Sequence, residues 1–238
     1  MIEVSGLTKK YGSLIAIENI TFRVRSGEIV GLLGPNGAGK TTTLRIITGY
    51  LPPTAGTAKI DGIDISQKPE KAKEKIGYLP ENAPLYPELT VEEYLRFVAG
   101  IRHLSDVDGR VIAILKRTGT EIVRKRLIGN ISKGYRQRVA IAQALIHDPD
   151  LLILDEPTVG LDPKQILEVR GLLKMLGGGR QAVIFSSHIL QEVSALCERV
   201  IIIHRGKIVA DQSISGATDL EALFLKLTEE EAADVVST

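Results

Sequence analysis

Residues 34–41 read Gly34-Pro35-Asn36-Gly37-Ala38-Gly39-Lys40-Thr41 and fit the pattern G-x-x-x-x-G-K-[S/T]. Glycines let the backbone wrap so that successive N–H groups point inward at a phosphate. An apolar run over residues 28–33 predicts a strand before the loop, and residues 40–48 predict a helix after it. The helix N-terminus adds the positive end of its dipole. This order of strand, loop and helix predicts a nucleotide-binding site.

The side chains of this loop have separate predicted parts in holding the phosphates. Lys40 supplies a point charge for the β- and γ-phosphates, and the Thr41 hydroxyl is a candidate Mg²⁺ ligand. A Gly-rich turn that matches by chance is the alternative, expected in roughly one chain in a hundred of this length. The predicted nucleotide contacts here are Gly34, Asn36, Gly37, Ala38, Gly39, Lys40, Thr41 and Thr42.

Two acidic residues follow a second apolar run. Leu151–Leu154 is typical of a fully buried parallel strand, and Asp155 and Glu156 come directly after it. Ligands gather at the carboxyl ends of such strands. Asp155 is therefore a candidate to hold Mg²⁺, directly or through water, and Glu156 to orient or deprotonate the attacking water. A strand that ends in solvated charges is the alternative, which the phosphate loop makes less favourable.

Strand and helix patterns alternate along most of the chain. Threonine and glutamate at positions 90 and 93 form a capping-box pattern that predicts another helix start. The alternation predicts a mostly parallel sheet with crossover helices, interrupted by an all-helical insertion. Further strands are predicted at residues 15–24, 76–79, 181–185 and 200–204, and further helices at 106–118, 133–146, 162–176 and 220–227.

Composition limits the possible classes of function. The 238 residues carry a net charge of +1 with acids and bases interleaved, which argues against a nucleic-acid binder. Cys197 is the single cysteine, so a disulfide framework is excluded. Residues 1–10 lack the apolar stretch of a secretory signal, and no apolar run approaches the roughly 18–20 residues that cross a bilayer. The sequence thus predicts a soluble chain that needs a partner for any membrane role.

Taken together, these motifs resemble the ABC (ATP-binding cassette) ATPase family over essentially the whole chain. The signature of that family is Leu-Ser-Gly-Gly-Gln, and residues 131–135, the signature turn, are Ile-Ser-Lys-Gly-Tyr. Ser132 and Gly134 match, whereas Lys133 and Tyr135 depart. The resemblance implies that Ser132 and Gly134 contact ATP bound by a second ATPase subunit. Lys133 could add positive charge near the γ-phosphate or face solvent.

Three further segments match the family. Tyr11 stands where the family stacks an aromatic ring on adenine, although an exposed tyrosine at a strand end would look the same. Residues 159–162 resemble the loop that crosses the dimer seam. His188, after a predicted strand, resembles the histidine that contacts the γ-phosphate and holds the water. The other histidines, His103, His147 and His204, are interpreted as surface or core residues.

Glu81 is a departure, because the family carries glutamine at this place, where it ligates Mg²⁺. A carboxylate also ligates Mg²⁺ but adds negative charge beside the phosphates. Glu81 is therefore either a metal ligand or a solvated loop acid. Together with the Ser-Lys-Gly-Tyr signature, this glutamate is similar to the subfamily that serves ABC-2 type exporters, which include drug-export and gliding-motility systems.

The resemblance implies an α/β fold with one ABC ATPase domain over residues 1–238. Its P-loop NTPase core has a mostly parallel sheet and an N-terminal antiparallel β subdomain, and comprises about residues 1–84 and 150–217. A helical subdomain is inserted at 85–149, and 218–238 form a C-terminal helix and tail.

The implied function is an ATPase subunit of an ABC transporter. Two ATPase subunits, identical or different, would enclose two ATP with Mg²⁺ head to tail and drive a separate transmembrane permease from the cytoplasmic face of the cell membrane. A non-transport ABC ATPase acting on DNA or ribosomes is the alternative, but such chains usually carry two cassettes or a long coiled coil. For a GTPase, the sequence lacks an Asn-Lys-x-Asp motif. Cargo, transport direction and the identity of the permease stay open.

Overall fold

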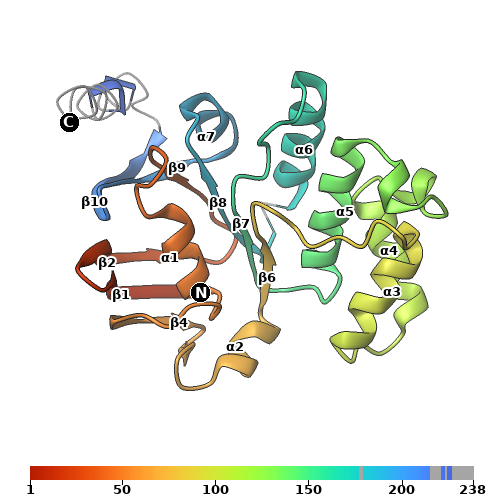
Figure 1. Ribbon diagram of the computed structural model, residues 1–238, viewed down its shortest axis with the longest axis horizontal. Coiled ribbons are helices and arrows are strands. Elements are labelled where there is room, and N and C mark those ends of the chain that lie inside the picture. Colours follow the sequence, from red (N-terminus) through yellow and green to blue (C-terminus); the bar gives the residue numbers. More distant parts are fainter. Residues whose placement is uncertain (177–178, 215–220, 223, 227–238) are drawn as a thin grey trace.

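A six-stranded sheet, with strand order β10-β9-β3-β8-β7-β6, forms the centre of the computed structural model (Figure 1). All neighbouring strands are parallel except β10, which pairs antiparallel with β9. The structure describes residues 1–176, 179–214, 221–222 and 224–226. The strands are β3 (Ile29–Leu33), β6 (Ile76–Leu79), β7 (Leu151–Leu154), β8 (Ala182–Ser187), β9 (Arg199–His204) and β10 (Lys207–Ser213).

Both faces of this sheet are covered, which explains its continuous apolar strands. In β7, Leu151 and Ile153 belong to one buried cluster, while Leu152 and Leu154 belong to the other. Because alternate side chains of a strand point to opposite faces, a strand buried on both sides needs apolar residues at every position. The sheet therefore separates two apolar cores, and polar side chains are found where its strands end.

A four-stranded antiparallel sheet, in the order β2-β1-β4-β5, contributes to the core that contains Leu151 and Ile153. Helix α1 (Lys40–Ile47) buries Leu44, Ile46 and Ile47 in the same apolar cluster. This packing fixes the helix that follows the phosphate loop against both sheets. The strands are β1 (Ile2–Tyr11), β2 (Leu14–Val24), β4 (Ala55–Ile60) and β5 (Ile63–Asp64), and α2 (Pro69–Glu74) follows β5.

Helices α3 to α7 lie on the other side of the six-stranded sheet and share the core that contains Leu152 and Leu154. Three of them, α3 (Val91–Ile101), α4 (Val107–Arg117) and α5 (Lys133–Leu145), lie between β6 and β7 in sequence and project to the right in Figure 1. The capping box at Thr90 and Glu93 is present, with the Thr90 backbone N–H donating to Glu93 at 2.8 Å. The remaining helices are α6 (Pro163–Leu176) and α7 (Leu190–Leu196).

The predicted α/β class, mostly parallel sheet and inserted helices are confirmed, and most predicted element bounds lie within one or two residues of those observed. Sequence reasoning assigned no bounds to β1, β4, β5, β10, α2 or α7. The predicted end of α6 at residues 177–179, the C-terminal helix and the tail fall partly or wholly outside the described residues. Within the described part, no helix is long and apolar enough to cross a membrane.

Candidate active site

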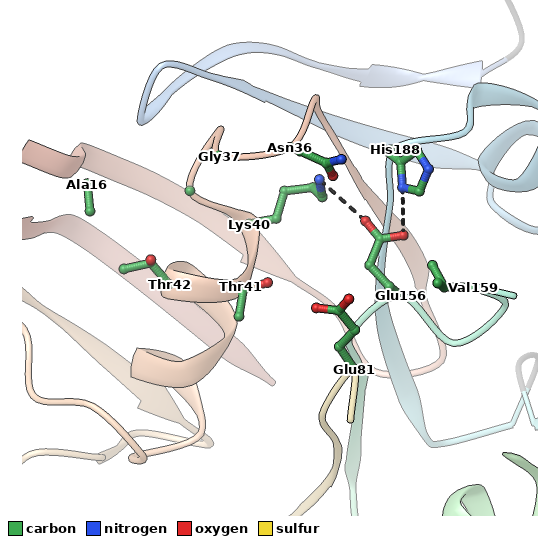
Figure 2. A pocket seen from close by; sticks show the side chains of 11 residues that line it. Ala16, Asn36, Gly37, Lys40, Thr41, Thr42, Glu81, Glu156, Val159 and His188 are labelled. Carbon is green, nitrogen blue, oxygen red and sulfur yellow. Dashed lines mark hydrogen bonds and ion pairs between the residues drawn. The ribbon is translucent and has the colours of Figure 1, made fainter. Parts of the chain in front are cut away.

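A cavity of about 360 Å³ opens where the phosphate loop meets the carboxyl ends of β6, β7 and β8 (Figure 2). Parallel strands place the residues that follow them at one edge of the sheet, so segments distant in sequence converge there. Its lining residues are Ala16, Asn36, Gly37, Gly39, Lys40, Thr41, Thr42, Glu81, Glu156, Val159 and His188.

The phosphate loop is built so tightly that two glycines are sterically required. Gly39 has a φ of 107°, and a Cβ there would lie 2.6 Å from the Ile17 side chain. A Cβ at Gly34 would collide with the backbone oxygen of Ile203 on β9. Gly34 and Ala38 are not among the lining residues, and their predicted contact with a nucleotide stays a prediction.

Lys40 is buried and its ammonium is fully engaged inside the chain. Its Nζ donates to the backbone oxygens of Gly34 at 2.7 Å and Pro35 at 3.0 Å, and lies 3.4 Å from Glu156 Oε1. The lysine is thus held over the loop at the point where a triphosphate would lie, with the carboxylate as its present counter-charge.

Asp155 is only 1% exposed and has one satisfied and one unsatisfied oxygen. Its Oδ1 accepts from Ser186 at 2.6 Å and from Thr41 at 3.2 Å. Its Oδ2 is buried without a hydrogen-bond partner among the described residues. An unsatisfied buried acceptor costs about 1–3 kcal/mol. A hard cation or its bound water beside Thr41 would supply the missing contact, so the donor set fits Mg²⁺.

Glu156 turns back into the cavity because its backbone adopts a left-handed conformation, with φ at 49°. Such a conformation costs a non-glycine residue about 1–3 kcal/mol and concentrates at functional sites. The backbone N–H of Glu156 donates to Ser186 Oγ at 2.9 Å. As Figure 2 shows, its carboxylate lies between Lys40 and His188, whose Nδ1 is 3.0 Å from Glu156 Oε2.

Two positioning residues were missed by sequence reasoning. Ser186 bridges Asp155 and Glu156, and Glu192 on α7 accepts from Thr158 at 2.6 Å and from Ser187 at 2.9 Å. The Glu192 contacts join the loop after β7 to the last residue of β8, and the next residue, His188, faces Glu156. A serine pair ending the apolar strand β8 was a weak signal for Ser186. Nothing in the sequence pointed to Glu192, which is buried on a helix.

Besides Gly34 and Ala38, three more predicted nucleotide contacts lie outside this cavity. Tyr11 is 48% exposed with the Lys9 ammonium 5.3 Å from its ring centroid, and Ala16 of the neighbouring strand lines the cavity instead. Ser132 and Gly134 lie at the start of α5, where Ser132 caps the helix by accepting from the Tyr135 N–H at 3.4 Å. Glu81 does line the cavity, and in Figure 2 its carboxylate points toward it.

Comparison with known proteins agrees with this geometry. The ABC transporter family matches residues 17–159. An ABC transporter ATP-binding protein of Bacillus subtilis, YdbJ, is 43% identical over 217 residues, covering 91% of this chain and 70% of that protein. The bacitracin transport ATP-binding protein BcrA of Bacillus licheniformis is 40% identical over 215 residues, 89% of this chain and 69% of that protein.

A solved structure extends the likeness to the whole fold. The ATP-binding cassette MJ0796, described as a dimer in a post-hydrolysis state bound to ADP and Pi, superposes with a TM-score of 0.80 at 29% identity. The match covers 91% of this chain and all of that one. This chain therefore belongs to the ABC transporter family, as an ATP-binding and ATP-hydrolysing subunit.

Proposed function

We propose that this chain is the motor of an ABC-2 type exporter and works with a second ATPase subunit, enclosing two Mg²⁺-bound ATP molecules head to tail. The observation that supports the catalytic part is the cavity in which Lys40, Thr41, Asp155, Glu156 and His188 meet. Similarity to a bacitracin transport protein supports export. The chain acts on the cytoplasmic face of the membrane, where it drives a separate permease.

Thr41 and Asp155 would hold Mg²⁺, with Glu81 as a further candidate ligand. Their arrangement supports this assignment because the buried Asp155 Oδ2 lies on the carboxylate whose other oxygen accepts from Thr41. When bound, the ion neutralises charge on the phosphate oxygens and fixes their geometry. Ser186 keeps the Asp155 carboxylate oriented, since its hydroxyl donates to Oδ1.

Glu156 is the residue that activates water. In the present structure its Oε1 faces Lys40 at 3.4 Å. A bound triphosphate competes for the Lys40 ammonium, which frees that oxygen to accept a proton from the attacking water. His188 holds the other oxygen at 3.0 Å, so the carboxylate stays aimed at the γ-phosphate. Transition-state charge is stabilised by Lys40 and the loop N–H groups.

The signature turn completes the site of the second subunit. Ser132 is exposed at the N-terminus of α5, so its hydroxyl and the neighbouring backbone N–H groups are accessible to a partner's nucleotide. Positioned donors can contribute roughly 3–4 kcal/mol to a developing charge, more than the helix dipole. Tyr11, which is exposed at the end of β1, stacks on adenine in the ATP-bound state.

The helical insertion, residues 85–149, supplies the face for the permease. A second cavity of about 470 Å³, which we name the arginine cavity, lies between α1, α3 and α5. It has no acidic lining residue, and neither Arg45 nor Arg102 forms an ion pair with any described residue. A permease carboxylate would match these two charges. The lining residues are Arg45, Tyr50, Tyr78, Pro80, Asn82, Pro84, Val98, Arg102, Gln143 and Ala144.

The variant Glu156→Gln tests the catalytic assignment. We expect it to bind ATP, to lose turnover at least about a hundredfold, and to accumulate as a nucleotide-dependent dimer in gel filtration, because removal of the general base leaves the cradle intact. Glu74→Gln, an exposed position on α2, is the matched control and should behave as the wild type. A Glu156→Gln protein that stays monomeric and hydrolyses ATP normally would refute the proposal.

A further inference from the structure

Lys133 stands in the signature turn, and its exposed side chain bends back over its own subunit. The ammonium lies against Gly160, so close that a Cβ at position 160 would collide with Lys133 Nζ. Gly160 has a φ of 70°, a conformation that favours glycine. The lysine and the glycine therefore fit as a pair.

Gly160 belongs to the 156–162 loop, which begins at the catalytic carboxylate. Two successive turns shape this loop. The Val159 backbone N–H donates to the backbone oxygen of Glu156 at 3.3 Å, and the Leu161 backbone N–H donates to the backbone oxygen of Thr158 at 3.2 Å. Val159 lines the nucleotide cavity beside Glu156 (Figure 2). Lys133 consequently touches the segment that positions the water-activating group.

Other contacts join the start of α5 to the same region. Gln137 Nε2 donates to the backbone oxygen of Pro157 at 2.7 Å. A Cβ at Gly134 would lie 2.8 Å from the Gln165 side chain, and Gln165 in turn exchanges hydrogen bonds with Asp162 at 2.9 and 3.4 Å. The signature turn and the 156–162 loop thus pack as one unit, and the Lys133 ammonium adds a contact at the middle of that loop.

No carboxylate lies within 4.0 Å of the Lys133 ammonium in the part of the chain that the structure describes. The contact with Gly160 is therefore a close approach of the ammonium to the backbone of the loop. Glycine at position 133, as in the Leu-Ser-Gly-Gly-Gln signature, would have no side chain to make this contact. The contact is therefore a consequence of this chain's departure from that pattern.

We propose that Lys133 is a positioning residue that fastens the 156–162 loop to the signature turn within one subunit. The turn acts on the partner's ATP and the loop carries Glu156, so the fastening couples the two ATP sites. This inference rests on the proposed function of the signature turn. Loss of the lysine should weaken the response of one site to occupancy of the other, while ATP binding in the cradle stays intact.

A double-mutant cycle of Lys133→Met and Gly160→Ala tests the pair. Methionine is an unbranched side chain one atom shorter than lysine and carries no charge, and alanine fills the space of the ammonium. We expect each single variant to lower kcat about fivefold and to reduce the Hill coefficient for ATP. The double variant should lose no more than the worse single variant, because both changes break the same contact. Backbone strain from alanine at a positive φ is present in both backgrounds and cancels.

Three measurements separate positioning from a general structural effect. The Kd for ATP should be unchanged in Lys133→Met, Lys133→Arg should restore the Hill coefficient, and Lys164→Met, an exposed lysine on α6, should match the wild type. Losses that multiply in the double variant, or an unchanged Hill coefficient in Lys133→Met, would overturn the inference. Should Gly160→Ala fail to fold, the two Lys133 variants decide it alone. A wild type without ATPase activity would instead contradict the proposed function.

Discussion

The nucleotide cavity and the arginine cavity differ in how their charges are balanced. In the nucleotide cavity, Lys40 faces Glu156 and two backbone oxygens, and Asp155 accepts from Ser186 and Thr41. In the arginine cavity, no acidic side chain balances the two guanidinium groups among the residues described. The charges of the first site are balanced within the chain, whereas those of the second are open to a negative charge from a partner.

The segment after β6 connects the two cavities. Glu81 lines the nucleotide cavity, and the next residue, Asn82, lines the arginine cavity. Tyr78 on β6 is a second connection, because it lines the arginine cavity and is affected by the charge of Asp155. Burial, and after it the charge of Asp155, raises the pKa of Tyr78 to about 12. Its hydroxyl is buried without a hydrogen-bond partner among the described residues and lies in the arginine cavity lining. A partner bound in the arginine cavity would therefore lie in a cavity whose lining includes Asn82, the residue that follows Glu81.

Removing the Lys40 ammonium from the nucleotide cavity should have the largest effect. We expect Lys40→Ala to raise the Kd for ATP about a hundredfold, since charged hydrogen bonds to phosphate contribute up to about 3 kcal/mol. Isothermal titration calorimetry would measure it. Lys71→Ala, an exposed lysine on α2, serves as the control. An unchanged Kd would mean that the cavity is not the nucleotide site.

Reversing a charge in the arginine cavity should have the next largest effect. Arg102→Glu is expected to weaken binding to the membrane subunit about thirtyfold, because it places like charges together in a partly buried site. Co-purification with the permease measures this loss, and ATP affinity reports whether the nucleotide cavity survives. Lys116→Glu makes the same charge change on exposed α4. Equal permease binding by both variants would remove the docking assignment.

Changing Glu81, in the segment that connects the two cavities, should have a smaller effect on ATPase activity. Glu81→Gln should keep ATPase activity within about tenfold, a barrier change of about 1.4 kcal/mol, since an amide oxygen can also ligate Mg²⁺. Steady-state turnover at saturating ATP measures it, with Glu88→Gln as an exposed control in the same loop. Complete loss of activity would show that the Glu81 carboxylate has a chemical role of its own.

The smallest effect concerns stability near the arginine cavity. Burial, together with the charge of Arg102, lowers the pKa of His147 from 6.5 to about 4. The unfolded chain therefore takes up a proton at a higher pH than the folded one, and the free energy of unfolding falls as pH drops through this window. Between pH 7 and pH 6 the loss should be less than about 1 kcal/mol.

Chemical denaturation at several pH values measures this dependence. His147→Gln should flatten it, because glutamine can still donate to the Ile76 backbone oxygen, which His147 contacts at 3.0 Å. His103→Asn, at an exposed position with positive φ, should leave it in place. A His147→Gln protein with the wild-type pH dependence would assign the effect to another group.

Sequence reasoning performed best where a local pattern has a single physical explanation. The phosphate loop, the buried strand β7 and the starts of α3, α5 and α6 were predicted because each depends on neighbours in the chain. Ser186 and Glu192 were missed because Ser186 Oγ donates to Asp155, 31 residues away, and Glu192 accepts from Thr158, 34 residues away.

The sequence by itself determined the alternation of strands and helices, the loop that wraps phosphate and the acids that follow a buried strand, since these are encoded in residues adjacent along the chain. Tertiary structure alone decided that Glu156 faces Lys40 and His188, that Lys133 rests on Gly160, and that Arg45 and Arg102 share one cavity. Such pairings depend on how the sheet brings segments that are distant in sequence together, and a local pattern of residues does not specify which distant residues become neighbours.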